Sequence, residues 1–204
     1  MPGNSLDRCR TAGNNSRGAT RARLQPTQER TLPAECLSRR QFLLSLAALP
    51  LAIPAAELAA APLDLPNPGA KDTCPVCGMF VAKYPHWIAT VRYRDGHAHH
   101  FDGAKDLFKY LHDLARWAPG QRHEDIEAIG VTEYYGLQRI AAKDAWYVIG
   151  SDVLGPMGHE LVPLATAADA EEFQKDHQGR RILRFDAVTP ALVQALDEGR
   201  FDVE

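Results

Sequence analysis

Residues 87–101, which read WIATVRYRDGHAHHF, decide the predicted fold of this chain. The segment 87–93 is rich in β-branched and aromatic residues, Asp95-Gly96 is a tight-turn dipeptide, and an extended pattern resumes from His97 to Phe101. Two extended runs joined by a short Asp-Gly turn are typical of a β-hairpin. We therefore predict two antiparallel strands here.

A helix is predicted directly after this hairpin. Asp102 is a residue type that caps helix N-termini, and apolar residues then recur at helical spacing until about Trp117, namely Leu107, Phe108, Leu111, Leu114 and Ala115. Pro119-Gly120 ends this pattern, and a further strand is predicted between Ile126 and Tyr135. The segment is thus a strand–strand–helix–strand unit.

The same order of elements is predicted a second time. Strands at 146–150 and 160–164 precede a helix that Thr166 caps and Gly179 follows. A strand at 181–185 comes next, and Thr189-Pro190 opens a last helix with proline at its first position.

Three pairs of matching residues indicate a duplicated unit. Trp87 matches Trp146, Phe101 matches Leu164 and Phe108 matches Phe173, and the offsets between the partners drift little. We predict an α+β fold of two small related strand–strand–helix–strand units packed together. The first unit is expected at 72–140 and the second at 141–204, after a Pro-rich linker at 62–71.

Residues 1–61 are predicted to be a disordered N-terminus followed by an export signal. Arg39-Arg40 precedes an apolar run from Leu43 to Ala56, which resembles a twin-arginine signal. The run is too short for a spanning helix of about 20 residues, so a transmembrane protein is not expected. Cys36 precedes the run, so no lipoprotein cysteine follows it, and we expect an exported periplasmic protein.

The composition excludes several functional classes. The formal net charge is −3, which gives no reason to expect a nucleic-acid partner. No nucleophile motif, phosphate-binding loop or metal-hydrolase helix is present. We therefore expect a protein that is not an enzyme.

The stretch that indicates chemistry is Cys74-Pro75-Val76-Cys77-Gly78-Met79. Two thiols with two residues between them either chelate one soft metal ion or close into a disulfide. Met79 adds a thioether, and thiolate and thioether donors together favour Cu(I) over Zn(II). Cys74, Cys77 and Met79 are therefore candidate ligands of Cu(I).

A second candidate pair lies in Gly155-Pro156-Met157-Gly158-His159-Glu160. On an extended segment, Met157 and His159 would point to the same side and form a two-donor clamp for Cu(I). The alternative is a packed methionine and a surface histidine. Among the other histidines, His97 and His99 share one face of the predicted hairpin, and we interpret that face as solvated.

These segments together resemble the NosL family, whose members are accessory proteins of nitrous oxide reductase maturation. The resemblance depends on the CPVCGM stretch from Cys74, on Phe101-Asp102 at the first helix, and on Met157-Gly158-His159-Glu160. It implies a periplasmic Cu(I)-binding chaperone of two related units. It also implies that the partners are nitrous oxide reductase, the NosDFY transporter complex, or both.

Two other functions compete with a copper chaperone. A thiol–disulfide oxidoreductase would use Cys74 and Cys77, but such enzymes place the pair between a strand and a helix that lowers a thiol pKa. Here a linker precedes the pair and a strand follows it. A structural zinc knuckle requires four ligands, and no second cysteine pair is present after the signal. A plain structural disulfide remains the simplest non-functional alternative.

Overall fold

The structure is a computed structural model that describes residues 59–203. Strands β1 (Ala89–Tyr93) and β2 (Ala98–Phe101) pair antiparallel, with Ala89 opposite Phe101. The connection passes through Gly96, whose φ of +92° is a conformation that glycine adopts without steric cost. The predicted hairpin is confirmed. The predicted export signal lies outside the described residues.

The predicted first helix is shorter than expected. Helix α1 (Ala104–His112) ends at Asp113, whose carboxylate accepts a hydrogen bond from Arg116 N and so starts the short α2 (Leu114–Trp117). The prediction of Asp102 as the N-cap was wrong, because the N-cap is Gly103 and makes no side-chain hydrogen bond. Two 3-10 turns flank this region, η1 (Val81–Lys83) and η2 (His123–Asp125).

The first sheet has the strand order β2-β1-β3-β4. Strand β3 (Ile126–Thr132) pairs antiparallel with β1, as the predicted unit requires. The three-residue β4 (Arg139–Ala141) was not predicted. The chain that enters the domain lies along β4, because Leu63 N donates to the Arg139 carbonyl at 2.7 Å.

The second sheet repeats this arrangement with β5 (Trp146–Ile149), β6 (Val162–Leu164) and β7 (Arg181–Arg184) in the order β6-β5-β7. Helix α3 (Ala167–Asp176) precedes β7, and Thr166 Oγ1 caps it by accepting from Asp169 N at 3.0 Å. In both sheets the first strand of the unit lies between the second and the third. The predicted α+β class is confirmed, and the predicted unit boundaries remain a prediction.

The register corrects one detail of the predicted repeat. Trp146 stands opposite Leu164, as Ala89 stands opposite Phe101. Ala89 rather than Trp87 is therefore the counterpart of Trp146.

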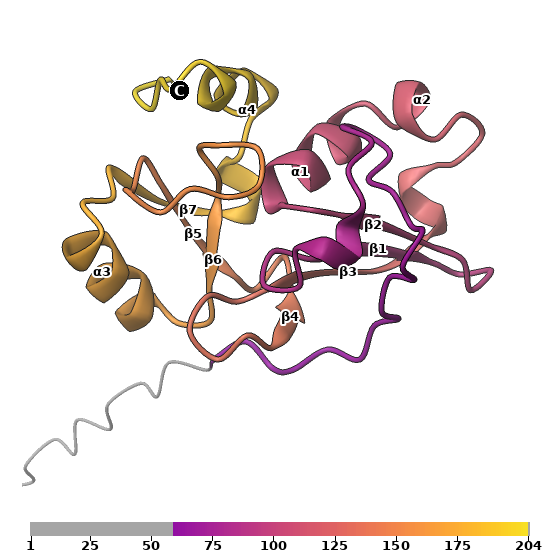
Figure 1. Cartoon of the computed structure of the whole chain (residues 1–204), viewed down its shortest axis with the longest axis horizontal. Helices are drawn as coiled ribbons and strands as arrows, with labels where there is room; N and C mark the ends of the chain where they lie inside the picture. Colours follow the sequence, from indigo (N-terminus) through magenta and orange to yellow (C-terminus); the bar gives the residue numbers. More distant parts are fainter. Residues whose placement is uncertain (1–58, 204) are drawn as a thin grey trace, which may run out of the picture. The chain divides into compact units, whose positions relative to one another are not determined.

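The last helix joins the two units. After η3 (Phe185–Ala187), α4 (Pro190–Asp197) begins at Thr189, whose Oγ1 accepts from Leu192 N at 3.2 Å, as predicted. Helix α4 packs on α1, which also contacts β1 and β2, whereas α3 covers the second sheet (Figure 1). Helix α1 is thus the central element of the domain.

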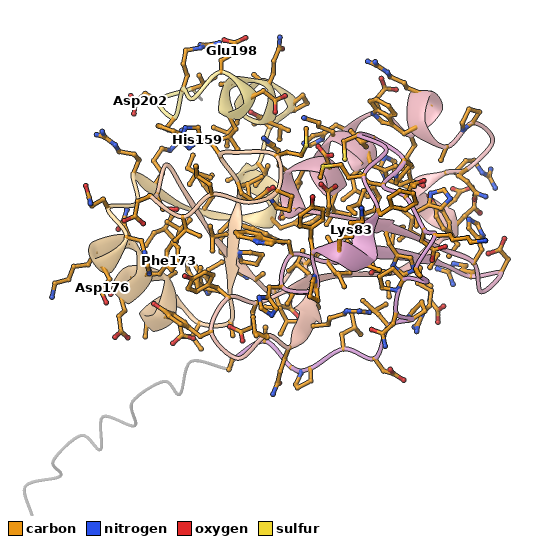
Figure 2. The ribbon with its side chains drawn as sticks, viewed as in Figure 1. Lys83, His159, Phe173, Asp176, Glu198 and Asp202 are labelled. Atoms are coloured by element: carbon orange, nitrogen blue, oxygen red, sulfur yellow. The ribbon has the colours of Figure 1, made fainter. Side chains whose placement is uncertain are left out.

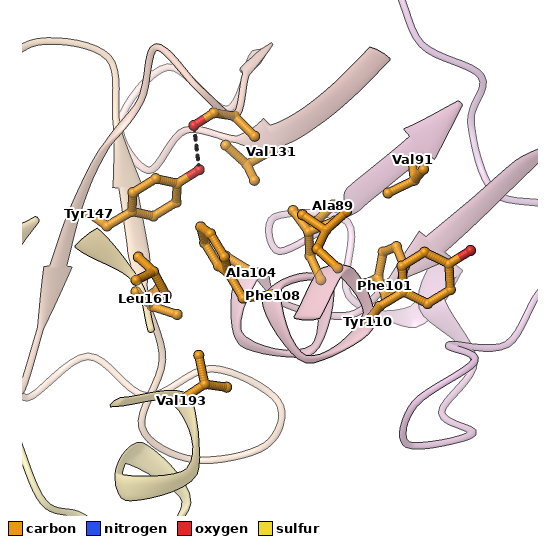
Figure 3. Close-up of a cluster of buried hydrophobic side chains, with 14 of the residues drawn as sticks. Ala89, Val91, Phe101, Ala104, Phe108, Tyr110, Val131, Tyr147, Leu161 and Val193 are labelled. Atoms are coloured by element: carbon orange, nitrogen blue, oxygen red, sulfur yellow. Dashed lines mark hydrogen bonds between the residues drawn. The ribbon is translucent and has the colours of Figure 1, made fainter. Parts of the chain in front are cut away.

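The core is continuous from one sheet to the other. Side chains from β1 and α1 meet side chains of the second unit and α4, as Figure 3 shows for Ala89, Phe108, Tyr147, Leu161 and Val193. Tyr147 is buried, and its hydroxyl donates to the Ala142 carbonyl at 2.7 Å. Within residues 59–203, no helix has the length and apolar character needed to cross a membrane.

Candidate metal centre

The cysteine stretch folds into a closed loop. Thr73 and Phe80 form a β-bridge, Cys74 N donates to the Met79 carbonyl at 2.9 Å, and Gly78 N donates to the Cys74 carbonyl at 2.8 Å. Gly78 has a φ of +77°, which a residue with a Cβ adopts only with strain. The loop presents both thiols to the same part of the domain, and both are free thiols.

Two carboxylates, one just before α1 and one in its first turn, face these thiols. The Cys77 Sγ–H donates to Asp102 Oδ1 at 3.0 Å, and the Cys74 Sγ–H donates to Asp106 Oδ2 at 3.5 Å. One potential ligand atom from each of the four side chains lies within 4.8 Å of the other three. Cys74, Asp102 and Asp106 are almost completely buried, and Cys77 is half-buried. Together these four residues form a candidate metal centre, named the Cys–Asp site below.

The electrostatics of the Cys–Asp site keep both thiols protonated while no metal is bound. Burial, with a smaller contribution from the nearby Asp106, raises the pKa of Cys74 to about 12. Burial and then the hydrogen bond to Asp102 raise the pKa of Cys77 far above its ordinary value. A metal ion that binds here must therefore displace thiol protons, and the adjacent carboxylates are placed to receive them.

One carboxylate oxygen of the Cys–Asp site has no partner. Asp102 Oδ2 is buried and makes no hydrogen bond to any residue from 59 to 203. Buried acceptors of this kind are rare in folded proteins, and a role in binding an ion is a recognised explanation. Asp106 Oδ1 differs, because Lys109 Nζ lies 3.2 Å from it as an ion-pair partner.

Lys109 belongs to a charged network that connects the Cys–Asp site with α4. Asp197 on α4 lies 2.9 Å from Lys109 Nζ and 3.0 Å from the Nζ of the buried Lys105. Because Lys105 and Lys109 both contact Asp197, this carboxylate holds the first turns of α1 in place beside the thiols.

The Met157 segment lies against the same end of α1. Lys105 Nζ donates to the Met157 carbonyl at 3.0 Å, and the Glu160 carboxylate accepts from Lys105 N at 2.5 Å and from Leu161 N at 2.9 Å. Glu160 thus satisfies an N-terminal amide of α1, which the expected cap Asp102 does not do. A Cβ at Gly103 would overlap the Glu160 carboxylate, so a glycine at the N-cap lets Glu160 approach.

The backbone of this segment is not extended, so the reason for expecting Met157 and His159 on one side was wrong. Gly155 and Gly158 exchange two backbone hydrogen bonds, which makes Pro156 and Met157 the tip of a tight turn. The Met157 side chain is 45% exposed. Whether its sulfur binds metal stays a prediction.

His159 packs on the C-terminal segment. Its ring contacts Phe201 edge-on at 4.9 Å between centroids, and Figure 2 shows it on the side of Glu198 and Asp202. His159 Nδ1 is buried and has no hydrogen-bond partner within the described part of the chain. Met79 is half-buried in the cysteine loop, and metal binding by either residue remains a prediction.

Comparison with known proteins identifies the family. The NosL family model matches residues 67–193, which is more than half of the chain. This chain belongs to the NosL family.

Three individual NosL proteins are similar to parts of this chain. The copper-binding lipoprotein NosL of Stutzerimonas stutzeri is 26% identical over 137 residues, which cover 61% of this chain and 65% of that protein. The crystal structure of the copper chaperone NosL from Shewanella denitrificans has a TM-score of 0.53 at 24% identity, and the match covers 64% of this chain and 99% of that one. It shows the shared NosL fold. The solution structure of apo-NosL from Achromobacter cycloclastes is 28% identical, covering 52% of this chain and 87% of that one, with a TM-score of 0.36.

The carboxylates of this NosL chain were not predicted from the sequence. Asp106 lies in the first turn of α1, whereas Asp102 precedes the N-cap Gly103 and lies outside the helix, so helical spacing alone does not bring the two carboxylates together. The available signal was a pair of aspartates at the junction between the predicted hairpin and the predicted helix. The sequence alone did not indicate that these two carboxylates meet a loop more than 20 residues earlier.

Proposed function

We propose that this chain is a periplasmic metallochaperone that binds Cu(I) at Cys74 and Cys77. The observation that carries the proposal is the convergence of two free thiols within a buried cluster of donors. Thiolates are the soft ligands that Cu(I) prefers. The names of the NosL relatives from Stutzerimonas and Shewanella, a copper-binding lipoprotein and a copper chaperone, support the same assignment.

Asp102 and Asp106 serve this binding as proton acceptors. Each thiol already donates a hydrogen bond to one carboxylate oxygen. When copper binds, the thiol proton can pass to that oxygen and from there to water. The two thiolates then hold the copper, and Met79, Met157 and His159 are the further proposed donors, either to the same ion or at a second site. A partner's sulfur adds before a donor of this chain leaves, so bare Cu(I) never forms.

The partners of this transfer are nitrous oxide reductase, the NosDFY transporter complex, or both. The twin-arginine-like signal at Arg39-Arg40 directs the chain to the periplasm. Changing both arginines to lysine should leave the precursor in the cytoplasm, and normal periplasmic accumulation would exclude this route. The chain acts by binding and transfer and has no catalytic step of its own.

Thiol–disulfide exchange is disfavoured by the raised thiol pKa values. Redox-active cysteines have lowered pKa values because the thiolate is the nucleophile. Burial raises both thiol pKa values here. Zn(II) binding is the more serious competitor, since two thiolates and two carboxylates are a complete tetrahedral ligand set for zinc.

A chelator competition on the full chain tests the proposal. The matched control is the double variant Cys9→Ser/Cys36→Ser, which removes the thiols of the predicted signal region and should still bind one Cu(I) in the reduced state. Cys74→Ser and Cys77→Ser, made in that background, should each lose Cu(I) to the chelator. Retention of Cu(I) by both variants would exclude the thiol pair as the copper site.

A further inference from the structure

A second group of potential metal ligands lies at the turn of the β1–β2 hairpin. His97 and His99 have ring centroids 5.4 Å apart, and both rings are half-buried at the edge strand of the first sheet. Two imidazoles that bind one Zn(II) at about 2.0–2.1 Å in tetrahedral geometry hold their centroids roughly 5 Å apart. The spacing of these two rings matches that arrangement.

The ring of His97 is fixed by a carboxylate. Its Nδ1 lies 2.5 Å from Asp95 Oδ1, and its backbone N–H donates to the same oxygen at 3.1 Å. A carboxylate only accepts, so the proton of neutral His97 sits on Nδ1 and Nε2 carries the free lone pair. Metal-binding histidines are held in this way, with the second nitrogen donating to a carboxylate.

The ring of His99 is fixed by a buried hydroxyl. Its Nδ1 lies 2.6 Å from the Tyr110 hydroxyl, which lies 2.5 Å from the Tyr93 hydroxyl. The hydrogen bonds among His99, Tyr110 and Tyr93 can run in either direction, because each hydroxyl can donate or accept. When His99 donates from Nδ1 to Tyr110, its Nε2 is free to bind a metal, as in His97.

The two rings are also held in place by packing. The Tyr93 ring stacks on His97 with centroids 4.4 Å apart and contacts His99 edge-on at 5.8 Å. Nε2 of neither histidine makes a hydrogen bond to a residue of the described range 59–203. Both rings are therefore oriented by their neighbours, and each has one nitrogen that no described residue uses.

We propose that His97 and His99 form a second metal site, which binds a divalent ion of the imidazole-preferring class such as Zn(II) or Cu(II). The ion is held by the two Nε2 atoms, with water in the remaining positions. Asp95 and Tyr110 are positioning residues that orient the rings through Nδ1. This site uses nitrogen donors only, so it differs in metal preference from the Cys–Asp site and does not depend on it.

The first test follows each histidine ring by nitrogen NMR while Zn(II) is added to the reduced full chain. Zn(II) does not oxidise the thiols, and each ring signal reports its own site even while the Cys–Asp site fills. The Nε2 signals of His97 and His99 should shift together, and the exposed His86 should not. Movement of His97 alone, or of neither ring up to millimolar Zn(II), would overturn the proposal.

The second test uses variants of the hairpin. His97→Ala should abolish the Zn(II)-induced shift of His99, and Asp95→Asn should weaken Zn(II) binding by roughly 10–100-fold, the usual effect of losing such a positioning group. Asn-Gly suits a hairpin turn as well as Asp-Gly does, so the fold should survive this change. His86→Ala is the matched control. Unchanged affinity in Asp95→Asn, with His97→Ala also unaffected, would identify the rings as a packing cluster only.

Discussion

The Cys77 thiol donates a hydrogen bond to Asp102 Oδ1 at 3.0 Å. Cys77 lies in the cysteine loop, and Asp102 lies 25 positions later, just before α1. The second oxygen of the same carboxylate is buried and has no hydrogen-bond partner within residues 59–203. Asp102 therefore meets the thiol with one oxygen and leaves the other available. This contact also explains why Asp102 does not cap α1.

Replacement of Asp102 by Asn should make Cys77 more reactive. The hydrogen bond to Asp102 is one cause of the raised pKa of Cys77, after burial, so removing the negative charge lowers that pKa. The thiolate fraction at pH 8 rises, and alkylation by iodoacetamide should become faster. Asp176→Asn, at an exposed position of α3, is the control and should react like the unmodified chain. Equal rates in all three proteins would show that Asp102 has no influence on the thiol.

Copper affinity should increase with pH. Both thiols are protonated in the metal-free protein, because their pKa values are raised, to about 12 for Cys74. Each thiolate that binds Cu(I) releases one proton, so the apparent association constant should rise by about two decades per pH unit between roughly pH 6 and 9. With Cys77→Ser the slope should fall to about one decade. A competition series at fixed ionic strength measures it, and a flat profile would mean that neither thiolate binds.

Glu160 should make the metal-free protein less stable as pH rises. Burial raises its pKa from 4.5 to about 8, so the folded state holds a proton that the unfolded state has already lost. The contribution of Glu160 is fully present below about pH 4.5 and is lost as pH rises to 8 and above, by on the order of 5 kcal/mol in total. Glu160→Gln keeps an acceptor for Lys105 N and should remove this dependence.

Urea unfolding at several pH values measures the effect of Glu160. The difference in free energy of unfolding between Glu160→Gln and the unmodified chain should grow in favour of the variant from pH 5 to pH 8. Parallel pH profiles for the two proteins would show that Glu160 ionises alike in the folded and unfolded states.

Met157→Leu should weaken Cu(I) binding while the fold is kept. Leucine conserves volume, and even in a core such a change usually costs less than about 1.5 kcal/mol. His159→Ala should lose a similar amount of Cu(I) affinity if the imidazole is a donor. Leu154→Ala, an exposed change in the same loop, is the control. Unchanged affinity in both Met157→Leu and His159→Ala would confine the copper site to the cysteine loop and α1.

Much of the fold could be predicted from the sequence because its signals are local. The Asp95-Gly96 turn and the caps Thr166 and Thr189 lie within a few residues of the elements they define, and all three are confirmed. The short β4 was missed, since three residues carry too little pattern. The tight turn at Met157 was mistaken for an extended segment although glycine flanks it on both sides.

Only half of the candidate site could be predicted, because the other half depends on tertiary packing. The cysteine pair is a local motif, whereas Asp102 and Asp106 gain their role only when the helix packs on the cysteine loop. Asp102 looked like a helix cap because aspartate is common there, but Glu160, 55 residues after Lys105, already satisfies that amide. Contacts at such separations depend on how the two sheets pack around α1.

The most direct test of copper binding at Cys74 and Cys77 is a competition titration of Cu(I) against Zn(II) on the reduced Cys9→Ser/Cys36→Ser chain. The thiol pair predicts that one equivalent of Cu(I) is retained against a chelator that removes Zn(II), and that Cys74→Ser abolishes this retention. Equal retention of both metals, or Cu(I) retention that survives Cys74→Ser, would contradict the assignment of Cys74 and Cys77 as a copper site.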